Sequence, residues 1–288
     1  MLVSTTLTGN SEALITDALE SVVAWVDRCI VIDTGITDDT LDMARRAVGD
    51  KLVVYQWPWR NDFAAARNYA LQTAAQEGAE WALTVDSDER MVFRASFSRN
   101  ELRTNGDMRV MFAYVMDQSY MKERFLRINS GVEWVGVAHE KCKDLPYDMK
   151  AATLNVAFTE VPKSHEQFRL KSERDVELLT EYVAQHPGEP RWLYYLGASL
   201  QNVQREEEAV PFYLLSAQLS GFREEGIIAT FRAVQCLGKL LRWSEAVDLC
   251  VHGLQVNPAA TELRHYLDMA THKAKLANSF DRPMGVAP

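Results

Sequence analysis

The sequence predicts an α/β domain with a mostly parallel sheet, followed by an all-α domain of helical repeats. Over the first ninety residues, short apolar runs typical of strands alternate with segments that have helical apolar spacing. From residue 168 onward, nearly all of the sequence has the spacing of amphipathic helices. Alternating strands and helices favour a parallel sheet that is covered by helices on both faces.

Local sequence patterns predict each strand and helix of the first domain. The four strands are the runs LVSTTL, CIVID, KLVVYQW and EWALTVDSD. The helices between them are expected over about 12–26, 40–48 and 62–76, with helix caps within Thr8–Ser11, within Thr37–Thr40 and at Asp62. Ligands bind at the carboxyl ends of the strands in such sheets, so the turns that follow the strands are the expected site.

A β-rich stretch follows, from residue 108 to about 159. The runs MRVMFAYVM, RFLRI, GVEWVGVAHE and ATLNVAFTEV read as strands, and no long helical pattern separates them. We expect antiparallel strands that extend the sheet and form one side of a cleft.

The helical part contains a repeat. Leu196-Gly197, Ala209 and Tyr213 fit the tetratricopeptide pattern, and Ala246 recurs 37 residues after Ala209. The usual period is about 34 residues, so a small insertion is expected in the turn. The expected domains are 1–165, the repeats 166–275 and a flexible tail 276–288. Two repeats are too few for a free-standing array, so we expect them to pack on the first domain or to form a homodimer interface.

Composition limits the partners and the compartment. The chain has 288 residues, and its 31 Lys and Arg against 40 Asp and Glu give a net charge of −9. Nucleic acid is therefore not an expected partner, because phosphate binding needs a basic surface. No apolar run has the length of a membrane span, and the N-terminus lacks the features of a signal peptide. The four cysteines form no CxxC pair, so we expect buried free thiols and a cytoplasmic protein.

Carboxylates gather at the predicted strand ends. Asp33 follows the second strand, and Asp86 and Asp88 follow the fourth. Like charges this close favour a nearby cation, and hard divalent cations prefer carboxylate oxygens while leaving positions open for phosphate. Helix capping accounts for Asp33 in part, but not readily for Asp86 and Asp88.

Three segments carry a resemblance to a known family. VIDTGITDDTLDMARR, WPWRNDFAAARNYAL and WALTVDSDER, in this order, resemble the family 2 glycosyltransferases of GT-A fold, and most of all the branch with C-terminal tetratricopeptide repeats. The resemblance covers about residues 1 to 165. It implies an inverting enzyme that uses Mn²⁺ or Mg²⁺ and moves a sugar from a UDP-sugar to a peptide, glycan or small-molecule acceptor.

The resemblance also assigns residues on the donor side. It implies that Asp88 ligates the metal and that Asp86 contacts the metal or the ribose. Asp33 would read the uracil ring, with a turn cap as the alternative role. Arg67 would approach the nucleotide or its phosphates, with a solvated helix Arg as the alternative. Two further donor contacts are expected in the first turn and at the start of the third helix, at Thr8 and Asp62, the latter being equally a helix cap.

The acceptor side is expected in VEWVGVAHE. Trp134, Gly136 and Glu140 resemble the glycine-containing loop and acidic residue that precede the acceptor site in this fold. Glu140 is the expected general base, and His139 is the alternative base or an acceptor contact. Trp134 is expected either to stack on a sugar or to lie in the core.

A third metal ligand is expected at His165, with a surface histidine as the alternative. Here the chain departs from the family pattern, because Glu166-Gln167 follows where the family usually has His-x-Gly. The turn after the first strand also lacks the family's basic residue, and Ile36 replaces a serine. Two other functions stay open: a helical-repeat scaffold with a degenerate transferase domain, and a nucleotidyltransferase.

Overall fold

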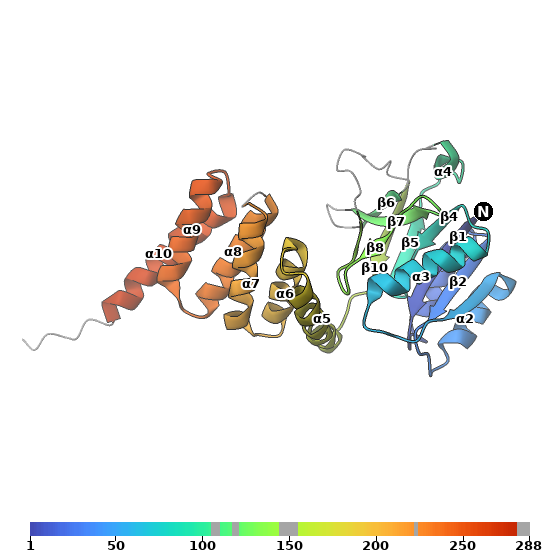
Figure 1. The fold of residues 1–288 in the computed structure, drawn as a ribbon, viewed down its shortest axis with the longest axis horizontal. Coiled ribbons are helices and arrows are strands. Elements are labelled where there is room, and N and C mark those ends of the chain that lie inside the picture. Colours follow the sequence, from blue (N-terminus) through green and yellow to red (C-terminus); the bar gives the residue numbers. More distant parts are fainter. Residues whose placement is uncertain (105–109, 117–120, 144–154, 222–223, 281–288) are drawn as a thin grey trace, which may run out of the picture. The chain divides into compact units, whose positions relative to one another are not determined.

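The computed structural model describes residues 1–104, 110–116, 121–143, 155–221 and 224–280. The chain divides into two compact units, Met1–Pro162 and Lys163–Pro288 (Figure 1). The first unit is a sheet with helices on its faces, and the second is built from helices. The predicted fold class, an α/β domain followed by an all-α helical domain, is confirmed.

Within the described residues, the first unit has an eight-stranded mixed sheet in the order β3-β2-β1-β4-β7-β6-β10-β5. Neighbouring strands from β3 to β4 run parallel, as the alternation of strands and helices predicts. The strand β7 is antiparallel to both β4 and β6. The strands are β1 (Leu2–Thr8), β2 (Arg28–Asp33), β3 (Leu52–Gln56), β4 (Trp81–Thr84), β5 (Glu89–Phe93), β6 (Val110–Val115), β7 (Met121–Arg127) and β10 (Val156–Glu160).

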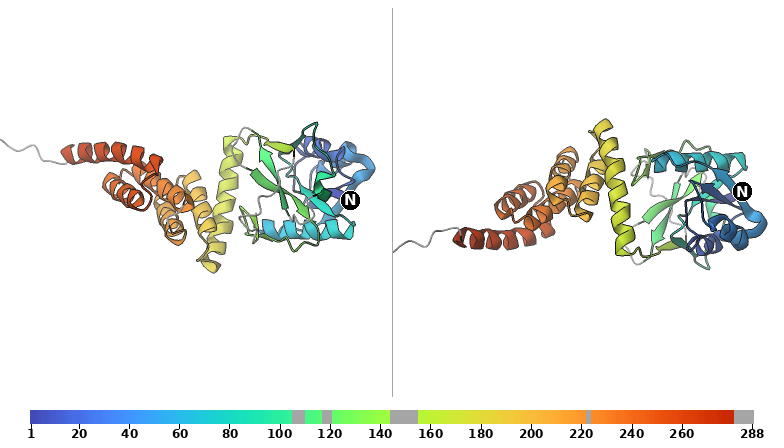
Figure 2. Two further views of the ribbon diagram at one scale, coloured as in Figure 1. Left: turned by 90° about the horizontal axis from the view of Figure 1, so that it is seen from above. Right: turned by 90° about the horizontal axis from the view of Figure 1, so that it is seen from below.

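Helices cover both faces of this sheet (Figure 2). The helices α1 (Ile15–Val23) and α2 (Thr40–Val48) pack on the face that includes Val31. The helix α3 (Phe63–Gln76) packs its alanines on the opposite face, against Ile30 and Ile32. Consecutive residues of β2 thus point to opposite cores, which is why its sequence is a continuous apolar run.

Two of the helix caps differ from each other. Asp62 is the N-cap of α3, and its Oδ1 accepts a hydrogen bond of 2.8 Å from the Ala65 amide, as expected. Ser11 does not cap α1 with its side chain. Its carbonyl accepts from the Leu14 and Ile15 amides, while its hydroxyl lies 3.3 Å from that of Ser87. The hydroxyl of this turn therefore faces the acidic segment after β4.

The strand predictions after residue 85 need three corrections. The strand β5 was not expected, and it pairs with β10 at the edge of the sheet instead of continuing β4. The strands β6 and β10 pair in parallel rather than antiparallel. The run GVEWVGVAHE holds only the short strand β8 (Trp134–Val135), paired with β9 (Lys141–Cys142) apart from the main sheet. The positive φ of Gly136 (100°) and His139 (52°) ends the extended backbone there. Residues 108–109 and 152–154 of the predicted strands lie outside the described residues.

The second unit consists of helices that pair in sequence order, as in helical repeats. They are α5 (His165–Gln185), α6 (Pro190–Asn202), α7 (Glu206–Leu219), α8 (Glu224–Lys239), α9 (Trp243–Val256) and α10 (Thr261–Phe280). Ala209 and Ala246 are fully buried in α7 and α9, as small residues at matching positions should be. The helix α10 extends through residue 280, past the point where a flexible tail was expected, and residues 281–288 lie outside the described residues.

The extra residues of the second repeat lie in a helix. The starts of α6 and α8 are spaced by the usual period, from Pro190 to Glu224, whereas α7 and α9 start 37 residues apart. The connections α6–α7 and α8–α9 span three residues each, 203–205 and 240–242. The difference comes from α8, which has 16 residues against 13 in α6. The predicted insertion in the turn is therefore wrong, because one more turn of helix absorbs the additional residues.

The structure bears on two expectations from composition, the state of the cysteines and the presence of membrane spans. All four cysteines are buried and free. Within the described part of the chain, no helix combines the length and the apolar character needed to cross a bilayer.

Candidate active site

The carboxyl ends of the parallel strands bring the donor-side residues to one edge of the sheet. Thr8 at the end of β1 lies beside Asp33 at the end of β2. The Thr8 carbonyl accepts from the Thr34 amide at 3.0 Å, and the Asp33 carbonyl accepts from the Trp57 amide at 2.8 Å. Thr8 itself is buried. Its contribution to this edge is therefore made mainly by its backbone.

Asp33 organises the turn that follows β2. Its Oδ1 accepts hydrogen bonds from the Gly35 amide at 2.8 Å and from the Ile36 amide at 2.7 Å. Gly35 has a φ of 121°, which a residue with a side chain rarely adopts. The turn is also tied to the loop after β1, because Asn10 Oδ1 accepts from the Thr37 amide at 2.7 Å. The capping role of Asp33 is thus present, and its role toward uracil stays a prediction.

Arg67 is the centre of a cluster of charged side chains at this edge. It is buried in α3, not solvated, and binds carboxylates from two distant segments. Its Nη2 donates to Asp86 Oδ1 and Oδ2 at 2.9 and 3.2 Å, and its Nε donates to Glu140 Oε1 at 2.5 Å. The guanidinium also lies 5.3 Å from the ring centroid of Trp134. One side chain therefore joins the acidic segment after β4 to the expected base.

The loop that carries Glu140 is fixed to α3 at two more points. The carboxamide of Asn68 accepts from the Trp134 amide at 2.8 Å and donates to the Trp134 carbonyl at 2.9 Å. The Phe63 amide donates to the Val137 carbonyl at 3.0 Å. Trp134 is buried, which agrees with a core role and excludes a sugar-stacking face. His139 lies between Val137 and Glu140 with a φ of 52°, and it is half-buried.

A second ion pair lies directly behind the acidic segment. Glu89 and Arg124 are both buried, and Arg124 Nη2 donates to Glu89 Oε1. The other oxygen of Glu89 accepts from the Asp86 amide at 3.1 Å. Glu89 therefore holds the backbone of the Asp-Ser-Asp turn from the interior of the protein. The turn is also held by the Asp88 carbonyl, which accepts from the Val161 amide at 2.7 Å.

The two carboxylates around this turn have opposite pKa shifts. Burial would raise the pKa of Asp86, but the positive charges of Arg67 and Arg124 outweigh it and lower that pKa. Burial raises the pKa of Glu89 to about 7, against the attraction of Arg124 and with the help of the Asp86 charge. The pKa of Arg67 is raised, because the two carboxylates outweigh the cost of burial. Asp86 is thus held ionised at neutral pH, whereas Glu89 titrates there.

The carboxylates after β4 fit a divalent cation for which the protein supplies only some of the ligands. Among the residues described, no three His, Cys, Asp or Glu side chains form a metal cluster. Asp86 and Asp88 supply carboxylate oxygens at this edge, and Asp86 also binds Arg67 through both of its oxygens. Mg²⁺ is commonly held by one or two carboxylates and completed by substrate phosphates and water. Asp88 and Asp86 would hold such an ion if the resemblance is right, and this role stays a prediction.

His165 belongs to the second unit, where it is the first residue of α5 and exposed. Ser164 and Gln167 form a capping box around it. The Ser164 side chain accepts from the Gln167 amide at 3.2 Å, and the Gln167 side chain accepts from the Ser164 amide at 2.8 Å. The departure from the family's His-x-Gly pattern thus has a local reason, since Gln167 starts a helix. The role of His165 as a metal ligand stays a prediction.

Sequence reasoning missed three residues of this site: Asn68, Glu89 and Arg124. Asn68 directly follows Arg67 in the segment AARN, and its place in this segment was an available signal. Glu89 stands next to the Asp-Ser-Asp segment, and its apolar neighbours Met91 and Val92 were a sign of a further strand. Arg124 had no local signal, because its partner is 35 residues away.

In open α/β sheets, ligands bind at the carboxyl ends of the parallel strands, which is the edge where these charged side chains lie. Residues 6–92 match the model of the family described as Glycosyl transferase family 2. The predicted resemblance is confirmed, and over this segment the chain is similar to that family.

Individual relatives extend the comparison. The SPbeta prophage-derived glycosyltransferase SunS of Bacillus subtilis is 26% identical over 220 residues, which are 70% of this chain and 50% of that protein. The chain thus spans about half the length of this relative. A TPR repeat-containing protein of Synechococcus elongatus is 37% identical over 103 residues, or 36% of this chain and 23% of that one. Among solved structures, S. aureus TarS 1-349 in complex with UDP-GlcNAc has a TM-score of 0.42 and 13% identity, covering 96% of this chain and 92% of that one.

Proposed function

We propose that this chain is a metal-dependent inverting glycosyltransferase that moves a sugar from a UDP-sugar to a peptide, glycan or small-molecule acceptor. The observation that carries the proposal is the position of Arg67, which binds both Asp86 and Glu140. The acidic segment suited to a diphosphate and its cation, and the carboxylate suited to an acceptor, are thereby held at the same edge of the sheet. The family match and the glycosyltransferase relative support this class of reaction.

Glu140 acts as the general base in this proposal, and its hydrogen bonds support that role. One of its oxygens, Oε1, accepts from Arg67, while no described residue bonds to Oε2. The acceptor oxygen forms a bond to the anomeric carbon as the bond from that carbon to the diphosphate oxygen breaks. The hydroxyl proton passes to Oε2 of Glu140. A single displacement of this kind inverts the anomeric configuration.

Arg67 acts in this scheme by positioning the carboxylates. Its fork geometry fixes Glu140 and Asp86 at once, and its burial keeps those contacts from exchanging with water. A direct contact between Arg67 and the phosphates is still a prediction from the resemblance. When bound at Asp88 and Asp86, a divalent cation would supply charge neutralisation for the departing diphosphate.

The donor class is tested by calorimetric titration of UDP and GDP, with and without Mn²⁺, into the wild type and the Asp88→Ala variant. We expect Mn²⁺-dependent binding of UDP that the variant loses. Asp33→Asn is the matched probe of base recognition, since its side-chain oxygen can still accept from the Gly35 and Ile36 amides. If a well-folded wild type binds neither nucleotide, the transferase proposal fails and a repeat scaffold becomes the better account.

A further inference from the structure

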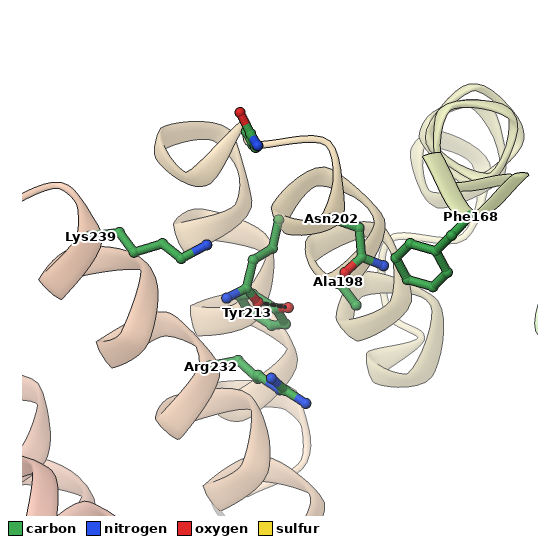
Figure 3. A pocket seen from close by; sticks show the side chains of 8 residues that line it. Phe168, Ala198, Asn202, Tyr213, Arg232 and Lys239 are labelled. Atoms are coloured by element: carbon green, nitrogen blue, oxygen red, sulfur yellow. Dashed lines mark hydrogen bonds between the residues drawn. The ribbon is translucent and has the colours of Figure 1, made fainter. Parts of the chain in front are cut away.

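The helical unit contains a pocket that the transferase chemistry does not use. It has a volume of about 420 Å³ and is lined from α5, α6, α7 and α8 by Phe168, Ala198, Gln201, Asn202, Gln204, Tyr213, Arg232 and Lys239. Figure 3 shows Lys239 and Arg232 projecting from α8, with Phe168 pointing from α5 toward Ala198 and Asn202. Surfaces across stacked helical repeats suit extended partners.

The lining is rich in hydrogen-bond donors. It includes the three amides Gln201, Asn202 and Gln204, the two cations Arg232 and Lys239, and no carboxylate. This is notable in a chain with a net charge of −9. A ligand that offers oxygen acceptors and negative charge therefore matches the pocket.

Tight packing beneath the pocket orients one of these amides. The ring of Tyr213 lies against α6 at Gly197, where an added Cβ would come within 3.0 Å of Tyr213 Cδ1. This close approach lets the buried Tyr213 donate its hydroxyl to Gln201 Oε1 at 2.8 Å. Because that oxygen is occupied by an internal donor, the amide nitrogen of Gln201 is the part left to meet a ligand.

The two cations differ in how far they are neutralised within the protein. Lys239 pairs with Glu206 at 2.8 Å. Arg232 contacts Gln235 at 3.4 Å, and no carboxylate among the described residues forms an ion pair with it. Arg232 is therefore the main source of uncompensated positive charge in the pocket.

Phe168 adds an apolar contact at the other end. Its side chain is 45% exposed, in the first turns of α5, although an aromatic ring gains free energy by burial. A small anion could use only the cations. An extended peptide could use the ring, the amides and the cations together, because its carbonyls match the amides and its acidic side chains match Arg232.

We propose that this pocket binds an extended, acidic peptide segment that carries an apolar residue. The carboxylates of the peptide bind Arg232, its backbone carbonyls accept from Gln201 and its neighbouring amides, and its apolar side chain packs on Phe168. The proposal does not rest on the transferase site, because all of these contacts lie within the helical unit.

The test is fluorescence anisotropy of the full chain with a labelled nine-residue peptide of Glu, Asp and Leu. The same peptide with Gln and Asn in place of the acids serves as the neutral probe. We expect the acidic peptide to bind and the neutral one to bind at least about tenfold more weakly. Arg232→Glu should weaken binding of the acidic peptide by about tenfold or more. Gln201→Leu and Phe168→Ser should each weaken it by about three- to tenfold.

Lys273→Glu is the matched control, since it makes the same charge change on an exposed residue of α10, away from the pocket. Circular dichroism spectra establish that each variant is folded. The proposal is overturned if the neutral peptide binds equally well, if Lys273→Glu weakens binding as much as Arg232→Glu, or if no peptide binds at millimolar concentration. Complete displacement by equimolar inorganic phosphate would also overturn it, because the pocket would then be a simple anion site.

Discussion

Two arginines in the first unit bind carboxylates in different settings. Arg67 holds Asp86 and Glu140, whose side chains are 32% and 13% exposed. Arg124 holds Glu89, and the side chains of that pair are 4% and 2% exposed. The first cluster faces the strand-end edge, where a ligand can reach its carboxylates, and the second supports the same turn from inside. Similar ion pairs thus form an accessible cluster at the proposed site and a buried cluster that supports it.

The largest expected effect is a loss of activity when the Arg67 cluster is broken. Arg67→Met leaves Asp86 and Glu140 without their common partner, so we expect sugar transfer to fall by roughly 10²–10³-fold. Initial rates with a UDP-sugar in the presence of Mn²⁺ measure this loss. Arg67→Lys keeps the charge but not the fork, and it should recover only part of the rate. Full activity in Arg67→Met would contradict the positioning role.

Arg124→Met should act on stability. It leaves Glu89 buried without its ion-pair partner, and breaking such a pair lowers the free energy of unfolding by about 3–5 kcal/mol. Urea denaturation followed by tryptophan fluorescence measures the change. Arg127→Met is the control on the same strand, because its pair with Glu80 is half-exposed and spans 4.0 Å, and we expect a loss of about 0–1 kcal/mol there. Equal losses in the two variants would remove the distinction between the clusters.

Glu89 should make stability depend on pH. Its pKa is raised to about 7 in the folded protein from 4.5. The stabilisation by its proton is therefore fully present below about pH 4.5 and is lost as the pH rises through 7. We expect this loss to be on the order of 2 kcal/mol between pH 5 and 8. Glu89→Gln should flatten the dependence in urea denaturation at the two pH values, and an unchanged slope would show that Glu89 is ionised throughout.

The smallest expected effect concerns the anchor of the Glu140 loop. Asn68→Ala removes two hydrogen bonds to the backbone of Trp134, which should lower the free energy of unfolding by about 1–2 kcal/mol. Gln72→Ala removes an exposed side chain from the same helix and should be nearly neutral. Thermal denaturation of both variants makes the comparison. If Asn68→Ala were also neutral, the loop would have to be held mainly by Arg67.

The clusters also mark the limit of what the sequence could predict. The strands up to β4, the cap at Asp62 and the paired helices follow from local patterns, and the structure has them. The acidic edge was predictable because parallel strands end on one side. The partners of Arg67 lie 19 and 73 residues away, and that of Arg124 lies 35 away. Those contacts depend on strand order and register, and no local pattern encodes that β7 inserts beside β4.

The most direct test of the central claim compares donor binding with turnover in Glu140→Gln. Calorimetry gives the affinity for UDP with Mn²⁺, and the release of UDP from a panel of UDP-sugars gives the rate. The account predicts that Glu140→Gln binds UDP within about threefold of the wild type and loses roughly 10²–10⁴-fold in rate, while His139→Asn keeps most of its rate. A Glu140→Gln variant with full turnover, or a His139→Asn variant that alone loses it, would contradict the assignment of Glu140 as the base.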